Sequence, residues 1–281
     1  MKTLLLASQS PRRHELLALL GLPFEVLSPN IVEAHRADEP PPEVAARLSL
    51  TKARAAWRIA NRTLTAPAPR AVIACDTVVA LNGRLLGKPR DEDEAGTMLR
   101  QLRARAHIVY SAFTILDTTT DQTLTEVAET IVMMRAYTDA EIAGYVASGD
   151  PMDKAGAYAI QHSGFHPVTE VRGCYTNVVG LPLCHLARHL YASGHWPGRS
   201  RRRRRPQTIG RTVPTVAGRG QTVGTGRSIN VRGRTINVRE VRRARVIRSP
   251  RDVPAACQAH TNRRCAVYTA ILNGECKACG R

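Results

Sequence analysis

The pattern of hydrophobic and polar residues is most regular at the start of the chain. An apolar run at residues 4–7 is typical of a short buried strand. Ser10 then stands where a helix N-cap belongs, and Pro11 takes the first helical position, where its missing N–H costs nothing. Leucines recur at helical spacing over residues 16–20, and Gly21 follows as a natural helix stop. The pattern predicts a strand, a tight turn and a helix.

Similar patterns continue to about residue 195. Apolar runs predict strands at 24–27, 71–81, 107–116 and 123–134, with a hairpin turn at Asn82-Gly83. Helical spacing and capping residues predict helices at 43–60, from Asp91 to Leu102, from Thr138 to Gly149 and from Pro182 to Gly194. Because strands and helices alternate irregularly, with hairpins among them, we expect an α/β fold with a mixed β-sheet and flanking helices.

Charge divides the chain into two parts. The 281 residues carry a net charge of +18, but residues 1–195 hold 20 basic and 20 acidic side chains. Residues 196–281 hold the other 21 basic and 3 acidic side chains, including an arginine run at 201–205. We therefore expect a neutral globular domain at 1–195 and a basic, poorly ordered extension at 196–281.

The extension offers two further interpretations. Alternating Ile, Val and polar residues within 207–240 are compatible with a basic β-ribbon as well as with disorder. Its positive charge favours non-specific binding to nucleic acid. Near the end of the chain, spacing close to that of a zinc ribbon makes four residues candidate zinc ligands, with free thiols as the alternative: Cys257, His260, Cys276 and Cys279.

Hydropathy gives no sign of a membrane protein. No run approaches the roughly 18 apolar residues of a membrane span, and Ser8 and Arg12 interrupt the N-terminal run too early for a signal peptide. Three of the seven cysteines lie in residues 1–195, without a disulfide framework. We expect a cytoplasmic protein with reduced thiols.

Two stretches carry candidate chemistry. Arg12 and Arg13 lie in the first turn of the predicted helix, where cations are unfavourable unless an anion such as phosphate completes the site. A solvated basic turn is the alternative. Asp76 interrupts the apolar run 71–81, where a carboxylate is costly unless it is compensated. It is either a functional group that faces a cleft or a structural, hydrogen-bonded aspartate.

Five blocks of the sequence resemble the Maf family of nucleoside triphosphate pyrophosphatases. They follow one another between Thr3 and Tyr191: Leu6-Ala-Ser8-Gln-Ser10-Pro-Arg12-Arg13-x-x-Leu16-Leu17, Cys75-Asp76-Thr77-Val78-Val79, Gly87-Lys88-Pro89, Asp153-Lys154-Ala-Gly156-Ala-Tyr158-Ala-Ile160-Gln161 and Asn177-Val-Val-Gly180-Leu-Pro182. The resemblance implies an elongated mixed sheet in two lobes, similar to inosine triphosphatase, with a central cleft. It also implies cleavage between the α- and β-phosphates, with Asp76 as the proton acceptor.

Three marker positions of the family, here Arg12, Thr77 and Gln161, resemble the branch that acts on dTTP and UTP. Together with these three, the expected substrate-binding residues are Ser8, Arg13, Lys52, Lys88 and Lys154. Lysine and arginine would hold the triphosphate, whereas Thr77 and Gln161 would read a pyrimidine edge. A divalent cation, Mg²⁺ or Mn²⁺, is the expected cofactor, with Asp76 and Glu33 as its ligands.

Two alternatives remain open at this stage. One is a Maf-type enzyme of the branch that acts on 7-methyl-GTP. The other is a nucleic-acid-binding protein whose globular domain has lost catalysis. The expected partners are the nucleoside triphosphate, nucleic acid bound by the extension, and a second copy of the chain in a homodimer.

Overall fold

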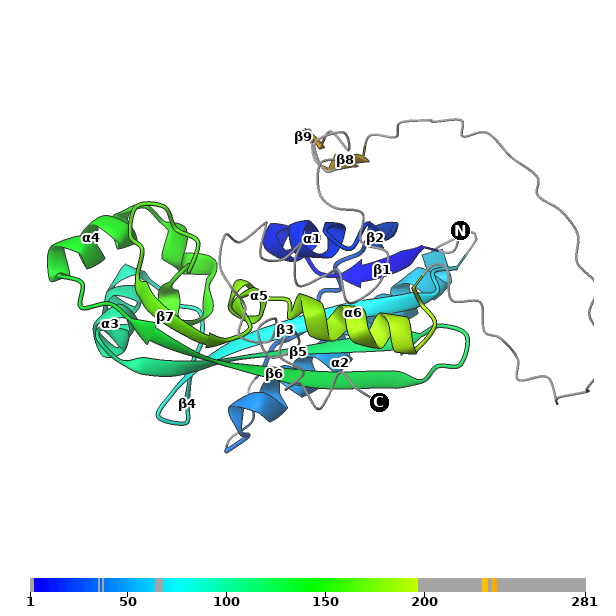
Figure 1. The fold of residues 1–281 in the computed structure, drawn as a ribbon, viewed down its shortest axis with the longest axis horizontal. Helices are drawn as coiled ribbons and strands as arrows, with labels where there is room; N and C mark the ends of the chain where they lie inside the picture. The colour runs from blue at the N-terminus through cyan, green and yellow to red at the C-terminus, as the bar shows by residue number, and fades with distance from the viewer. Residues whose placement is uncertain are drawn as a thin grey trace, which may run out of the picture.

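One mixed sheet organises the fold around its central strand, β3 (Ala71–Leu81). The computed structural model describes residues 3–34, 36, 38–63 and 68–196, and the backbone of residues 229–231 and 234–236. Within the first group, seven strands form a sheet of order β2-β1-β3-β5-β6-β7, with β4 paired to β3 (Figure 1). The remaining strands of the sheet are β1 (Leu4–Ala7), β2 (Phe24–Val26), β4 (Arg84–Leu86), β5 (Ala106–Asp117), β6 (Thr123–Met134) and β7 (Val168–Gly173).

Strand direction changes at β3. Strand β1 is parallel to both β2 and β3, whereas β4, β5, β6 and β7 each pair antiparallel with their neighbours. The predicted mixed sheet with flanking helices is confirmed. Strand β7, at the edge, was not predicted.

Helices cover both faces of the sheet and one end of it. Figure 1 shows α1, α5 and α6 on one face and α2 on the opposite face. It shows α3 and α4 together at the end of the sheet where β5 begins and β6 ends. The helices are α1 (Pro11–Ala18), α2 (Pro41–Thr63), α3 (Glu92–Leu102), α4 (Asp139–Ala147), α5 (Tyr175–Val179) and α6 (Leu183–Ala192). Two short 3₁₀ turns, η1 (Asp150–Asp153) and η2 (Ala155–Ala157), follow α4.

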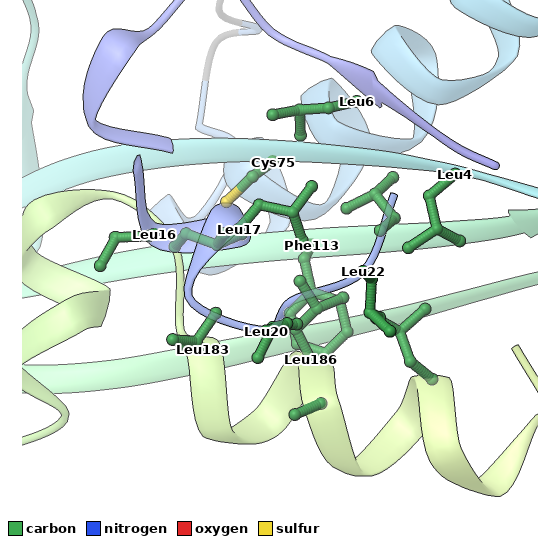
Figure 2. Close-up of a cluster of buried hydrophobic side chains, with 14 of the residues drawn as sticks. Leu4, Leu6, Leu16, Leu17, Leu20, Leu22, Cys75, Phe113, Leu183 and Leu186 are labelled. Atoms are coloured by element: carbon green, nitrogen blue, oxygen red, sulfur yellow. The ribbon is translucent and has the colours of Figure 1, made fainter. Parts of the chain in front are cut away.

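Strand alternation explains the continuous apolar run of β1. Leu4 and Leu6 pack with the leucines of α1 and α6 on one face (Figure 2). Leu5 and Ala7 pack on the other face, against the alanine-rich side of α2. Because helices cover both faces, no position of this strand meets water, and the usual alternation of polar residues is absent.

Local signals placed several helix ends correctly. Asp91 caps α3 by accepting a hydrogen bond from the backbone N–H of Glu94 at 2.8 Å, and Thr138 and Glu141 form the predicted capping box of α4. At α1 the prediction is also confirmed, since Ser10 is the N-cap residue, although its side chain makes no capping hydrogen bond.

The last described residues of the domain are tied to the beginning of the sheet. Trp196 is buried in the core cluster that includes residues of α1 and α6. The guanidinium of Arg70 donates to the carbonyl oxygen of Gly194, and its backbone N–H donates to Thr3 at 2.8 Å. Arg70 directly precedes β3, so residues 194–196 lie at the ends where β1 and β3 begin.

Beyond residue 196 the structure describes two short strands only. Strand β8 (Ile229–Val231) pairs antiparallel with β9 (Arg234–Ile236), as the β-ribbon interpretation of this region expects. The candidate zinc ligands Cys257, His260, Cys276 and Cys279 lie outside the described residues. Among the described helices, none has both the length and the apolar character that a bilayer crossing needs.

Helix α6 is fastened to β6 by a half-buried ion cluster around Glu126. Its carboxylate lies 2.5 Å from Nδ1 of His185 and 2.9 Å from a guanidinium nitrogen of Arg188, and it also bonds Nε2 of His189. Burial would raise the pKa of Glu126, but the hydrogen bonds and charges of His185, His189 and Arg188 outweigh it and lower the pKa from 4.5 to about 2.

We expect Glu126→Gln to lower the free energy of unfolding at neutral pH by roughly 1.5–3 kcal/mol, the range for hydrogen bonds to charged groups. Because the folded pKa lies below the unfolded one, this contribution is complete above pH 4.5 and is lost as the pH falls toward 2. Denaturant unfolding of both proteins between pH 2 and pH 7 measures it.

Glu170→Gln is the matched control, because Glu170 pairs with Arg172 on the exposed surface of β7. Exposed pairs contribute little, so this variant should follow the wild type at every pH. A stability difference for Glu126→Gln that stayed constant across the pH range would contradict the role given to its ionised form.

Candidate active site

A gap in the strand pairing of β3 opens into a cleft of about 1220 Å³. One edge of β3 pairs with β5 along residues 71–80. The other edge pairs with β1 at residues 71–74 and with β4 at residues 79–81. Residues 75–78 therefore lie between the two partner strands, where side chains and ligands, rather than another strand, can approach the backbone.

Neighbouring residues in this gap point to opposite faces of the sheet. Asp76 faces α2 and meets Lys52, whereas Thr77 faces α1 and meets Arg13. Lys52 stands one helical turn after Leu48, whose side chain packs against the sheet beside Val78, so both project toward β3. The consecutive residues Asp76 and Thr77 therefore contact helices on opposite faces of the sheet, and both helices line the same cleft.

Lys52 joins two carboxylates. Its Nζ lies 2.5 Å from Oδ1 of Asp76 and 2.6 Å from Oε1 of Glu33. Asp76 is 5% exposed, so an unpaired charge there would be strongly destabilising. The ammonium group compensates the carboxylate that interrupts the apolar strand.

Glu33 lies in the loop before α2 and is more exposed than its partners. Partial burial acts to raise the pKa of its carboxyl group. The hydrogen bond and charge of Lys52, together with the charges of Lys88 and Arg13, outweigh that effect and hold the pKa below its ordinary value. Glu33 is therefore a carboxylate at neutral pH, surrounded by cations.

Arg13 is held in place by two acceptors. Its Nε donates to the carbonyl oxygen of Gly180 at 2.8 Å, and its Nη2 donates to the hydroxyl of Thr77 at 3.0 Å. The Sγ–H of Cys75 donates to the same Gly180 carbonyl at 3.1 Å, and burial raises the pKa of that thiol to about 11. Gly180 has a φ of +127°, a backbone conformation that favours glycine.

Other polar side chains of the cleft are uncommitted. Within the described part of the chain, the side chains of Arg12, Lys88 and Gln161 make neither a hydrogen bond nor an ion pair, and all three line the cleft. Ser8 also lines it, and its hydroxyl accepts a hydrogen bond from the backbone N–H of Ser10 at 3.2 Å. Free cationic and amide groups are thus available to a ligand.

The structure brings every predicted site residue to this cleft. Its lining includes Ser8, Arg12, Arg13, Glu33, Lys52, Asp76, Thr77, Lys88, Lys154 and Gln161. The sequence analysis quoted Gly180 only as part of the block Asn177-Val-Val-Gly180-Leu-Pro182 and gave it no role in the site. Its role comes from a contact with Arg13 that spans 167 positions, which no local pattern reveals.

Comparison with known proteins identifies the family of this chain. The family model described as Maf-like protein matches residues 3–193, which include all ten residues of the predicted site. The chain belongs to the Maf family.

Relatives within the Maf family carry a common name. A protein of Syntrophus aciditrophicus named dTTP/UTP pyrophosphatase is 44% identical over 192 residues, which are 68% of this chain and 90% of that protein. A protein of Salmonella typhimurium with the same name is 45% identical over 183 residues, 65% of this chain and 89% of that protein. Among solved structures, the Ham1 protein of Staphylococcus aureus is similar at a TM-score of 0.36, with 14% identity, and covers 59% of this chain and 80% of that chain.

In this Maf domain, Lys154 organises the loop on the far side of the cleft. Its buried Nζ bonds the carbonyl oxygen of Asp150, a carboxylate oxygen of Asp150 at 3.0 Å and one of Asp153 at 2.6 Å. An ammonium group has three hydrogens to donate, and three acceptors take them. In this state, Lys154 stabilises the 150–154 turn, and its predicted contact with substrate stays a prediction.

The same loop is fastened to the segment that carries Lys88. The backbone N–H of Gly156 donates to the carbonyl oxygen of Gly87 at 3.0 Å. Gly156 has a φ of +70°, and a Cβ there would lie 3.1 Å from a methyl group of Val79. Only glycine allows the loop to approach β3 this closely.

The cleft contains two oxygen donors suited to the expected divalent cation. Asp76 and Glu33 offer hard carboxylate oxygens, and both carboxylates contact the same ammonium group, that of Lys52. Magnesium is commonly held by one or two carboxylates, with phosphate and water completing its shell, so these residues fit it. Among the described residues, no cluster of three or more histidine, cysteine, aspartate or glutamate side chains is arranged for a metal. A cation here would need ligands from the substrate.

We expect Gly156→Ala to destabilise the domain by roughly 1–3 kcal/mol, because alanine is strained at this φ and its Cβ presses on Val79. The loop would move away from Gly87, and activity should fall together with stability. Thermal unfolding and pyrophosphate release measure the two effects.

The matched control is Gly144→Ala in α4. No atom lies within 4 Å of the Cβ position at Gly144, and alanine is the better helix former by up to about 1 kcal/mol. This variant should keep or raise the melting temperature. Equal behaviour of the two variants would contradict a special requirement for glycine at 156.

Proposed function

We propose that this Maf-family protein hydrolyses dTTP, UTP and modified pyrimidine analogues to the nucleoside monophosphate and pyrophosphate, and so removes them from the nucleotide pool. The two relatives named above support the reaction and its nucleotides. One observation carries the proposal: Asp76, paired with Lys52, shares a cleft with Arg12, Arg13 and Lys88.

The cations hold the triphosphate. Arg12 and Lys88 are assigned to phosphate oxygens because their side chains have no partner among the described residues. Arg13 adds guanidinium hydrogens beyond the two that bond Gly180 and Thr77. Guanidinium groups suit phosphate because they bind two oxygens at once.

Asp76 then accepts the proton of the attacking water. Lys52 bonds one oxygen of the Asp76 carboxylate and leaves the other for this task. The water oxygen forms a bond to one of the two phosphorus atoms that flank the α–β bridging oxygen, and a proton passes from this water to Asp76. The P–O bond of the bridge breaks, and the nucleoside monophosphate and pyrophosphate leave.

A Mg²⁺ or Mn²⁺ ion is part of the proposal. Asp76 and Glu33 would hold it together with phosphate oxygens. When bound, such an ion neutralises phosphate charge and lowers the pKa of water. Lys52 would continue to orient both carboxylates from the α2 side.

We assign recognition of the base to polar side chains of the cleft that have no hydrogen-bond partner among the described residues. The hydroxyl of Thr77 already bonds Arg13, so this marker residue acts on the guanidinium rather than directly on the base. Exposed Gln161 keeps both its amide N–H and its carbonyl for a pyrimidine edge. The alternative branch, which acts on 7-methyl-GTP, is not favoured, because the relatives are named for dTTP and UTP.

The remaining partners stay predictions. Nucleic acid binding concerns the basic extension, most of which lies outside the described residues. A homodimer and a cytoplasmic location likewise rest on the sequence alone. A domain without catalysis is not favoured, because Asp76, Lys52 and Lys88 all reach the cleft.

We expect Asp76→Asn to lower turnover of dTTP at least about 100-fold, because the amide cannot accept the proton from water. Nucleotide binding should persist or tighten, since a negative charge near the phosphates is removed. Pyrophosphate release and calorimetric binding measure the two outcomes separately.

Asp139→Asn serves as the control, because Asp139 is exposed at the start of α4 and pairs with Arg103, away from the cleft lining. Its turnover should match that of the wild type. Wild-type turnover in Asp76→Asn would overturn the assignment of Asp76 as the proton acceptor.

We expect Gln161→Glu to lower kcat/KM for dTTP and UTP about tenfold or more, because a carboxylate repels the carbonyl oxygens of a pyrimidine. Its melting temperature should not change, since Gln161 is exposed. Gln101→Glu, on the exposed side of α3, is the control and should keep the full substrate profile. An unchanged profile in both variants would rule out base reading by Gln161.

A further inference from the structure

We propose that Ser111, which does not line the cleft, is a positioning residue that fixes the guanidinium of Arg13 through the hydroxyl of Thr77. Ser111 lies on β5, directly opposite Thr77 on β3, and is fully buried. Its Oγ lies 2.8 Å from the hydroxyl oxygen of Thr77 and donates to the backbone carbonyl of Asn177 at 2.9 Å. The inference rests on the proposed function only in its consequence for catalysis.

The number of hydrogens sets the direction of this hydrogen-bond chain. Each hydroxyl has one hydrogen to donate, and a carbonyl can only accept. Ser111 gives its hydrogen to the carbonyl of Asn177, so the short contact between the two hydroxyls requires Thr77 to donate. The oxygen of Thr77 is then left as an acceptor, which is what the guanidinium N–H of Arg13 needs.

No second acceptor serves Thr77 equally well. The carbonyl of Gly180 lies 3.4 Å from the Thr77 hydroxyl, a long contact. That carbonyl already accepts from Nε of Arg13 and from the thiol of Cys75, and a carbonyl oxygen has two lone pairs. Without Ser111, the Thr77 hydrogen would compete with Arg13 for Gly180 or be left unpaired.

Asn177, at the end of this hydrogen-bond chain, is anchored to the sheet. The buried side-chain amide of Asn177 shares its two hydrogens among three acceptors, the carbonyls of Val109 and Ala128, at 3.0 and 3.1 Å, and the hydroxyl of Thr130 at 2.8 Å. These bonds fix α5 against β5 and β6. The hydrogen-bond chain therefore runs from the guanidinium of Arg13 through Thr77 and Ser111 to the backbone carbonyl of Asn177, a residue that its side chain fixes to the sheet.

A second pair of buried hydroxyls in the domain, Ser49 and Thr114, resembles the pair Ser111 and Thr77 but bonds no arginine. Ser49 on α2 is also fully buried, donates to the carbonyl of Ala46 at 2.9 Å and lies 2.8 Å from the hydroxyl of Thr114. Neither Ser49 nor Thr114 lines the cleft. Ser111→Ala and Ser49→Ala thus each remove a fully buried hydroxyl that bonds a backbone carbonyl and a threonine hydroxyl, and only the first bears on Arg13.

The experiment compares Ser111→Ala, Ser49→Ala, Thr77→Val and the double variant Ser111→Ala/Thr77→Val. Steady-state pyrophosphate release gives kcat and KM for dTTP, and calorimetry gives the affinity for inorganic tripolyphosphate. Thermal unfolding reports stability for each. In the ligand-free proteins, NMR follows the hydrogen exchange of the Arg13 Nε–H.

We expect Ser111→Ala to lower kcat/KM between about 10- and 100-fold, the range for a misplaced catalytic-site contact. It should also weaken tripolyphosphate binding and speed exchange of the Arg13 Nε–H. Ser49→Ala should lose comparable thermal stability yet keep kcat/KM within about twofold. The double variant should be no worse than Thr77→Val, because Ser111 acts through that hydroxyl.

Equal effects of the two serine variants, or additive effects in the double variant, would overturn the inference. The exchange measurement separates this outcome from failure of the proposed function. If the wild type released no pyrophosphate from any nucleoside triphosphate, the proposed function would fail. Faster Arg13 exchange in Ser111→Ala alone would still support the positioning role, and unchanged exchange would reject it.

Discussion

The ion pair between Lys52 and Asp76 is the interaction on which the rest of the structure depends. A carboxylate that is 5% exposed lies in the central strand of the sheet, where its charge would be strongly unfavourable without compensation. Helix α2 supplies that compensation from one face, at 2.5 Å. The alanine-rich side of α2 packs closely on β1 and β3, and this packing keeps the ammonium at the carboxylate. The ion pair that compensates the buried charge of β3 therefore also lines the cleft.

The interrupted edge of β3 gives this contact its access to solvent. Strand β1 ends after four residues and β4 pairs only further along, so the central strand is open between them. Period-two alternation then sends Asp76 and Thr77 to different helices. A cleft with a carboxylate on one side and a fixed guanidinium on the other follows from strand length and register.

Local signals in the sequence predicted much of the fold and of the site. Pro11, Asp91 and the Thr138–Glu141 capping box mark helix starts through contacts with near neighbours, which sequence spacing can reveal. Asp76 was identified because a charge in an apolar run is costly. The partners of Arg13 and Thr77 could not be found in this way, because Gly180 and Ser111 reach them across the sheet. Edge strand β7 and the short helix α5 were also missed, since both depend on tertiary packing.

The anchoring of Trp196 and of the Gly194 carbonyl beside Arg70 has a topological consequence. The chain departs from the Maf domain where β1 and β3 begin, whereas the cleft lies past the opposite end of β1. Sequence joined after residue 196 thus starts at the opposite end of β1 from the cleft. A fold with this exit point can acquire additional C-terminal sequence without rebuilding the cleft.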